Sequence, residues 1–136
     1  MPSSLALLFF FSTSVFAMEL KCTTGQIRWY HEKKQSQEII NYCTNDDGTV
    51  FVSKDCYLTQ CWKKFNITQL ALDKAIDQEI GSPGFAICRS LKGVPQIIEF
   101  EHQKRWVSLD RCRLKEGDID TGLLFKVLND KVKTSR

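Results

Sequence analysis

Two histidines, His31 and His102, are the side chains of this sequence best suited to acid–base chemistry. Imidazole titrates near neutral pH, so a pair of histidines with a nearby lysine can cleave RNA by general acid–base catalysis. The alternating pattern around His31 places it on one strand face with Ile27 and Trp29, and His102 falls within an expected turn. We therefore do not expect an enzyme, and a small secreted hydrolase that uses His31 and His102 stays as an alternative.

Six cysteines are the other residues with chemical potential. They are Cys22, Cys43, Cys56, Cys61, Cys88 and Cys112. An even number in a short exported chain predicts disulfides, because the export compartment is oxidising and a small core benefits from cross-links. Zinc would need paired CxxC or CxxH spacings, which the chain lacks. We expect no metal, no cofactor and no cysteine left over as a nucleophile.

Aromatic and basic residues around the Cys56–Cys61 segment form the first candidate for a binding surface. They are Tyr57, Trp62, Lys63 and Lys64. Aromatic rings beside cations on a cross-linked loop are typical of recognition surfaces. The alternative is that these rings pack against the helix expected to follow.

A strip of cations is the second candidate. Arg111, Arg113 and Lys115 alternate along one expected strand, so they project from one of its faces. Such a strip could receive an anionic lipid head group, a glycan or an acidic protein. A solvated face that is partly offset by acidic residues on the neighbouring strand is the alternative.

The N-terminal residues predict export. Residues 1–17 carry no charged side chain, Leu5–Phe11 form an apolar core, and Val15 and Ala17 suit the positions before a signal-peptidase cut. We expect cleavage after Ala17, a single mature domain over residues 18–136, and a secreted or periplasmic location. Beyond the cut, no apolar run approaches the about 18 residues of a membrane span, so no transmembrane segment is expected.

A weak internal repeat divides the mature chain into two units, over about residues 22–53 and 82–125. In each unit the second cysteine is followed by an acid–glycine pair, Asp47-Gly48 or Glu116-Gly117, which favours a turn. Alternation of apolar and polar residues predicts two hairpins and one further strand. The expected strands cover residues 26–32, 38–44, 49–53, 95–101 and 105–114.

The repeat also suggests how the cysteines pair. Six cysteines allow fifteen connectivities. The symmetry of the two units favours the pairs Cys22–Cys43 and Cys88–Cys112, which leaves Cys56–Cys61 as a short local loop.

Helices are expected between and after the two units. A capping box predicts one that begins at Asn66 and ends near Gly81. A serine–proline pair predicts a second over residues 82–93, and a third covers about residues 121–131. The sequence thus predicts an α+β fold, a small disulfide-stapled domain of two hairpin units with two or three short helices.

One segment resembles a known family. The family pattern has an Asn-Pro that opens a short helix, a cysteine five residues after the proline, a glycine pair and a later Cys-x-Phe-x-Asp-Gly-Ser segment. In this chain its proline, cysteines and glycines are matched by Pro83, Cys88, Gly93, Cys112 and Gly117. Ser82 replaces the Asn, Lys92 replaces one glycine, and Leu114, Glu116 and Asp118 are near matches. Over residues 82 to about 118 the chain is therefore similar to small exported bacterial proteins that are often labelled hemolysins, whose domain has no settled function. The resemblance implies an exported bacterial setting. The matched residues specify a scaffold and not a chemistry.

The functional expectation is an exported, disulfide-stabilised, non-enzymatic module that binds an envelope or extracellular macromolecule. The net charge of +3 comes from 19 basic and 16 acidic residues, a balance that does not call for nucleic acid. We expect a protein, glycan or lipid partner and a monomeric chain. A membrane-active, hemolysin-like protein is an alternative, although the mature chain has no strongly amphipathic basic segment.

Overall fold

The fold is a closed barrel of six antiparallel strands, in the order β1-β2-β3-β6-β5-β4. The computed structural model describes residues 19–77 and 82–134, so the predicted signal peptide lies outside the described residues. The strands are β1 (Lys21–His31), β2 (Lys34–Thr44), β3 (Phe51–Ser53), β4 (Val94–His102), β5 (Arg105–Leu114) and β6 (Gly117–Asp120). The helices are α1 (Lys54–Thr59), the 3-10 helix η1 (Cys61–Lys64), α2 (Gln69–Ile76), α3 (Pro83–Ser90) and α4 (Thr121–Thr134).

The prediction of an α+β fold built from two hairpin units is wrong. The hairpins β1–β2 and β4–β5 exist, but they do not form separate units. Strand β1 pairs with β4 through Ile27↔Phe100 and Arg28↔Glu99, and β3 pairs with β6 through Val52↔Ile119. These two long-range pairings join both hairpins into one sheet that closes on itself, and closure pairs only part of the strand edges that two separate hairpins would expose.

The barrel interior is filled by aromatic and branched side chains that alternate along the strands. Ile27, Tyr42, Phe51, Ile98 and Phe100 are all buried. The rings of Tyr42 and Phe51 have centroids 5.2 Å apart, and those of Phe51 and Phe100 are 5.3 Å apart, within the range of favourable ring contacts. These rings therefore form a packed core inside the barrel.

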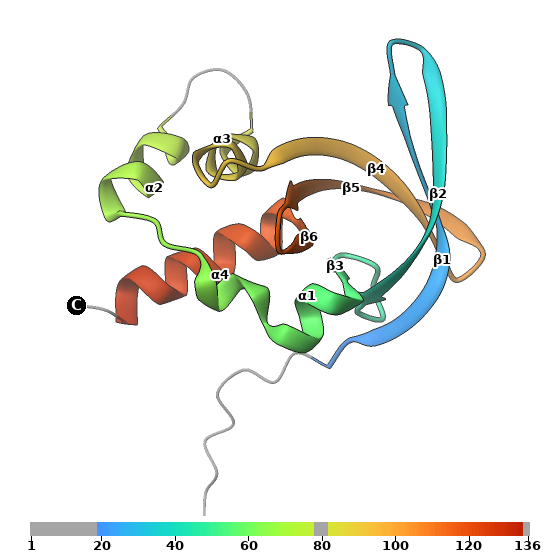
Figure 1. Cartoon of the computed structure of the whole chain (residues 1–136), viewed down its shortest axis with the longest axis horizontal. Helices are drawn as coiled ribbons and strands as arrows, with labels where there is room; N and C mark the ends of the chain where they lie inside the picture. The colour runs from blue at the N-terminus through green and yellow to red at the C-terminus, as the bar shows by residue number, and fades with distance from the viewer. Residues whose placement is uncertain (1–18, 78–81, 135–136) are drawn as a thin grey trace, which may run out of the picture.

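A second core lies between the barrel and its helices. Buried residues of α2, α3 and α4 pack there against Cys43, Val52, Cys112 and Ile119, which come from four of the strands. Figure 1 shows the helices gathered on one side of the barrel, while the tip of the β1–β2 hairpin stands clear of it on the other side. The helices thus cover only part of the barrel surface.

The expected cysteine pairing is confirmed. Cys22–Cys43 links β1 to β2, Cys56–Cys61 links α1 to η1, and Cys88–Cys112 links α3 to β5. Gly93 is required beside the third bridge, because an added Cβ would lie 2.5 Å from the Cys112 sulfur.

The local predictions for helices are partly correct. Helix α3 begins with Ser82 at its N-cap and Pro83 in its first turn, as the serine–proline pair predicts. Helix α2 instead begins after Thr68, whose hydroxyl accepts from the Ala71 amide, so the cap expected at Asn66 is wrong. The sequence patterns also missed α1, η1 and the short strand β6.

Candidate functional site

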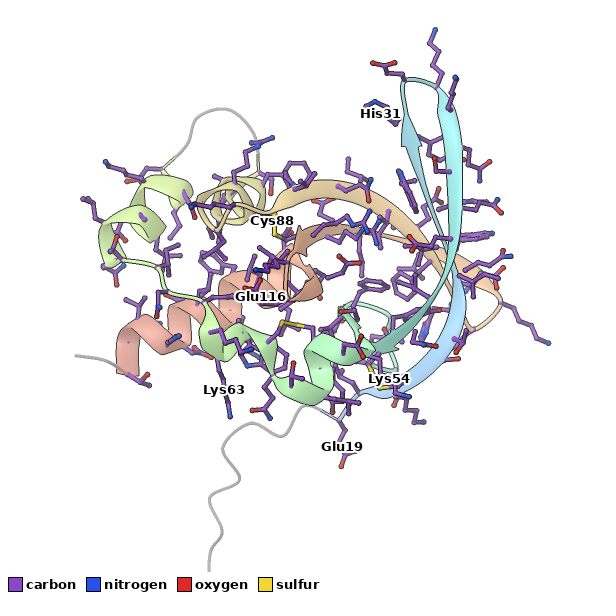
Figure 2. The ribbon with its side chains drawn as sticks, viewed as in Figure 1. Glu19, His31, Lys54, Lys63, Cys88 and Glu116 are labelled. Atoms are coloured by element: carbon purple, nitrogen blue, oxygen red, sulfur yellow. A yellow bond between two sulfur atoms is a disulfide. The ribbon has the colours of Figure 1, made fainter. Side chains whose placement is uncertain are left out.

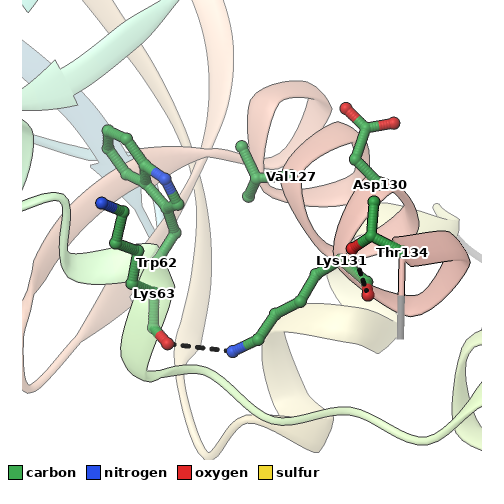
Figure 3. A pocket seen from close by; sticks show the side chains of 6 residues that line it. All are labelled: Trp62, Lys63, Val127, Asp130, Lys131 and Thr134. Carbon is green, nitrogen blue, oxygen red and sulfur yellow. Dashed lines mark hydrogen bonds between the residues drawn. The ribbon is translucent and has the colours of Figure 1, made fainter. Parts of the chain in front are cut away.

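A groove of about 300 Å³ between η1 and α4 is the candidate binding site (Figure 3). It is lined by Trp62 and Lys63 from η1 and by Val127, Asp130, Lys131 and Thr134 from α4. The floor of the groove is apolar where Trp62 faces Val127. Charged groups lie at its sides.

The backbone that leads into Trp62 is fixed by three features of the preceding segment. Helix α1 ends at Gln60, which adopts a left-handed conformation with φ of 50° and donates its amide to the carbonyls of Cys56 and Tyr57. The disulfide then joins Cys56 to Cys61, and both of these cysteines are buried. Trp62 follows directly, so its indole projects from the segment that the Cys56–Cys61 disulfide holds in place.

Lys131 links α4 to the same segment by hydrogen bonds. Its ammonium group donates to the carbonyl oxygen of Lys63 at 2.9 Å and to that of Phe65 at 2.5 Å. These carbonyls belong to the end of η1, where a backbone oxygen has few partners within so short a helix. Leu128 and Leu124, one and two turns earlier in α4, are buried in the core. The wall of the groove formed by α4 is therefore held in place by packing and by hydrogen bonds.

The groove combines an apolar anchor position with a small excess of positive charge. Trp62 is half-buried and packs against the core, but its ring also lines the groove. Lys63 and Lys131 are positive, and Asp130 is the single acidic residue of the lining. Such a surface favours an apolar side chain that is accompanied by a carboxylate.

The structure brings together only part of the aromatic and basic cluster expected from the sequence. Trp62 and Lys63 line the groove. Tyr57 is half-buried and packs against the core, and Lys64 is exposed outside the lining. Trp62 also packs against the core, as the alternative expected, and the helix across the groove from it is α4. Val127, Asp130 and Lys131 were missed, because nothing in the sequence places α4 beside η1.

The cationic strip does not form an open surface. Arg111 is completely buried at the inner side of β5, where its guanidinium donates to Gln96 at 2.9 Å and to Asp118 at 3.1 Å. Burial lowers the pKa of Arg111, and the neighbouring Asp118 acts in the opposite direction. Arg113 and Lys115 remain exposed, so two of the three expected cations reach solvent.

The two histidines lie far apart, His31 at the end of β1 and His102 at the end of β4. His31 is exposed at the hairpin tip, as Figure 2 shows. His102 lines a polar hollow together with Gly25, and its Nε2 lies 2.7 Å from the carbonyl oxygen of Asp46. Six residues of extended strand separate Gly25 from His31, which corresponds to roughly 20 Å. The structure therefore does not bring the two imidazoles to one substrate.

Among residues 19–77 and 82–134, no three metal-binding side chains are grouped closely enough to hold an ion. None of the described helices is both long and apolar enough to cross a membrane.

Comparison of the chain with protein-family models, with curated proteins and with solved structures gave no match. The resemblance of residues 82 to about 118 to exported hemolysin-labelled proteins therefore stays a prediction.

Proposed function

We propose that the protein is a non-enzymatic binding module of the cell envelope or extracellular space, and that it recognises a partner protein through the groove between η1 and α4. The observation that carries this proposal is the half-buried Trp62 ring over an open, mainly apolar groove with fixed walls. A preorganised site lowers the ordering cost of association. Three disulfides support an oxidising location, secreted or periplasmic, after removal of residues 1–17.

The charge of the lining selects the chemistry of the partner. Lys63 and Lys131 outnumber Asp130, and the ammonium group of Lys131 is already engaged by two carbonyl oxygens. Lys63 is exposed and is the cation available to a ligand. We infer a peptide segment that places an apolar side chain against Trp62 and an acidic side chain near Lys63.

The test uses random peptides displayed on phage, selected on the immobilised protein. Peptides that bind should be enriched in an apolar residue next to acidic residues. Each selected peptide is then added to protein with ¹⁵N-labelled tryptophan, and the indole signals of Trp29, Trp62 and Trp106 are followed by NMR. The signal of Trp62 should move, while that of Trp29 in the barrel should not.

Replacing Trp62 by alanine should weaken binding of a selected peptide by more than about 1 kcal/mol, or roughly fivefold or more, if the ring is the anchor. The matched control is Trp106→Ala, because Trp106 is also half-buried but lies outside the groove, with its ring under Arg28. Circular dichroism measures the folded fraction of each variant. Unchanged affinity per folded molecule for Trp62→Ala would show that this ring serves the core alone, and the proposed site would then be rejected.

Two activity assays distinguish this proposal from the other functional classes. Release of dye from liposomes by the protein would favour a membrane-active protein. Turnover of RNA or peptidoglycan would favour a hydrolase, and the His31→Ala and His102→Ala variants would assign it. A binding module shows neither activity.

A further inference from the structure

We propose that two copies of this chain associate through the free edge of β2, in an antiparallel pairing centred on Ser36. This inference is independent of the groove, because it concerns the opposite part of the molecule (Figure 1).

The free edge is the distal part of the β1–β2 hairpin. The two strands pair along their whole length, from Lys21↔Thr44 to His31↔Lys34. On its other side β2 pairs with β3 only through residues 42–44. In the described part of the chain, residues 34–41 therefore have no strand on that side. Their unpaired backbone groups are a template for another strand.

Most side chains along this edge are exposed. Lys34, Glu38 and Ile39 are all exposed, and Ile39 keeps 67% of its accessible surface. Neither Lys34 nor Glu38 has an ion-pair partner within the described residues. They do not pair with each other, and four residues of extended strand separate them by roughly 13 Å. The Glu38 carboxylate acts on Arg111 only through a longer-range electrostatic interaction, which favours the charged guanidinium and raises its pKa against the larger effect of burial.

The order of charges on β2 is complementary to itself. In a two-fold antiparallel pair, a residue that faces a second residue on the partner is matched by the reverse contact. Centring on Ser36 places Lys34 opposite Glu38 of the second copy, twice, and Gln35 opposite Gln37. Opposite charges that face each other across strands stabilise the pairing.

Other registers lose this match. Moving the centre to Gln37 places Lys34 opposite Ile40 and Glu38 opposite Ser36. Moving it to Glu38 brings two carboxylates together, which is unfavourable. Lysine on an edge strand normally opposes association, but here the second copy supplies the opposite charge in one register. The charges therefore favour a second copy of this chain as the partner, and they favour the register centred on Ser36.

The contact is small, so association should be weak and reversible. The centred segment, residues 34–38, is about 16 Å long at the usual rise per residue, and interfaces of limited area belong to transient complexes. Salt should weaken it further, because the paired charges are exposed to solvent.

The experiment is sedimentation equilibrium of the exported protein over a range of concentrations, at low and at physiological salt. The wild-type protein should show a reversible monomer–dimer equilibrium. Lys34→Glu and Glu38→Lys should each weaken it by about tenfold, because each replaces two attractive pairs by two repulsive ones. The double variant Lys34→Glu/Glu38→Lys should restore association, since both pairs form again with exchanged signs.

The control is Lys74→Glu, which makes the same change of charge on an exposed position of α2 and should leave the equilibrium unchanged. Within residues 34–38, hydrogen exchange of the amides that point to the free edge should slow as the concentration of wild-type protein rises. A chain that stays monomeric throughout would overturn the proposal and leave the edge to a strand of another protein. A dimer insensitive to the single reversals, or not restored by the double variant, would overturn it equally.

Discussion

Arg111 is a buried charged residue that stabilises the packing of several strands of the barrel. Its guanidinium is completely buried, donates to Gln96 and Asp118, and lies 5.1 Å from the ring centroid of Trp29. It thereby connects side chains of β1, β4 and β6 around β5. A buried cation is tolerated only when its hydrogen bonds and its charge are both satisfied, and here they are.

Replacing Arg111 by methionine should lower the free energy of unfolding by about 3 kcal/mol, because Gln96 loses a partner and Asp118 loses its closest cation. The matched control is Arg113→Met. The Arg113 side chain is 43% exposed, and its Nε lies 3.6 Å from Asp118, so this change should cost less than about 1 kcal/mol. Chemical denaturation measures both values. Equal effects of the two substitutions would contradict the role given to Arg111.

At the scale of single residues, the sequence shows which side chains are charged and which strand they share, but not whether each side chain is buried or exposed. The alternation of Arg111, Arg113 and Lys115 correctly places them in one strand, β5. It cannot tell which face of that strand turns inward, because that depends on how β5 pairs with β6. Asp118, which neutralises Arg111, lies in the strand that the patterns missed.

The position of η1, which forms one wall of the groove, depends on the disulfide between Cys56 and Cys61, which closes a short loop. Cys56 and Cys61 are 5 residues apart, whereas Cys88 and Cys112 are 24 apart. All four cysteines are buried, so replacing either pair by alanine removes similar packing. A cross-link that closes a shorter loop restricts the unfolded chain less.

Cys56→Ala/Cys61→Ala should therefore lower the free energy of unfolding by about 1 kcal/mol less than Cys88→Ala/Cys112→Ala does. Urea denaturation of the two double variants measures the difference. The first pair should nevertheless reduce binding of the peptides selected on the groove, because Trp62 loses its fixed position. If the short bridge contributed as much stability as the long one while binding stayed unchanged, its proposed role in shaping the groove would be wrong.

Elements whose signal is local were predictable. The two long hairpins follow from alternation and from polar turns, and α3 follows from its opening serine and proline. Helix α1 and η1 have 6 and 4 residues, too few for a helical period to emerge. Strand β6 has 4 residues and begins at Gly117, so its sequence resembles the continuation of a turn.

At the scale of the whole molecule, closure of the barrel makes the two hairpins interdependent. Phe51 of β3 packs against Tyr42 from the first hairpin and Phe100 from the second. Two independent hairpin units would unfold separately, whereas a single closed sheet with a shared core should unfold in one cooperative transition. No local pattern foretold this closure, because it depends on pairings between residues more than sixty positions apart.

Thermal unfolding should therefore give one midpoint, whether it is followed by far-ultraviolet circular dichroism or by tryptophan fluorescence. Phe51→Ala should lower the free energy of unfolding by about 3 to 5 kcal/mol and shift both signals together. Separate midpoints, or a Phe51→Ala variant in which only one signal moves, would indicate two units that unfold independently.

The filled barrel interior affects how the sequence of this protein can evolve. The aromatic rings and Arg111 occupy the inside of the sheet, and both proposed contact surfaces lie outside it. Exposed positions such as Asp130 beside the groove and Gln37 on the edge of β2 can be exchanged without altering any buried side chain. Selection can thus redirect what the protein contacts while its folded framework stays the same.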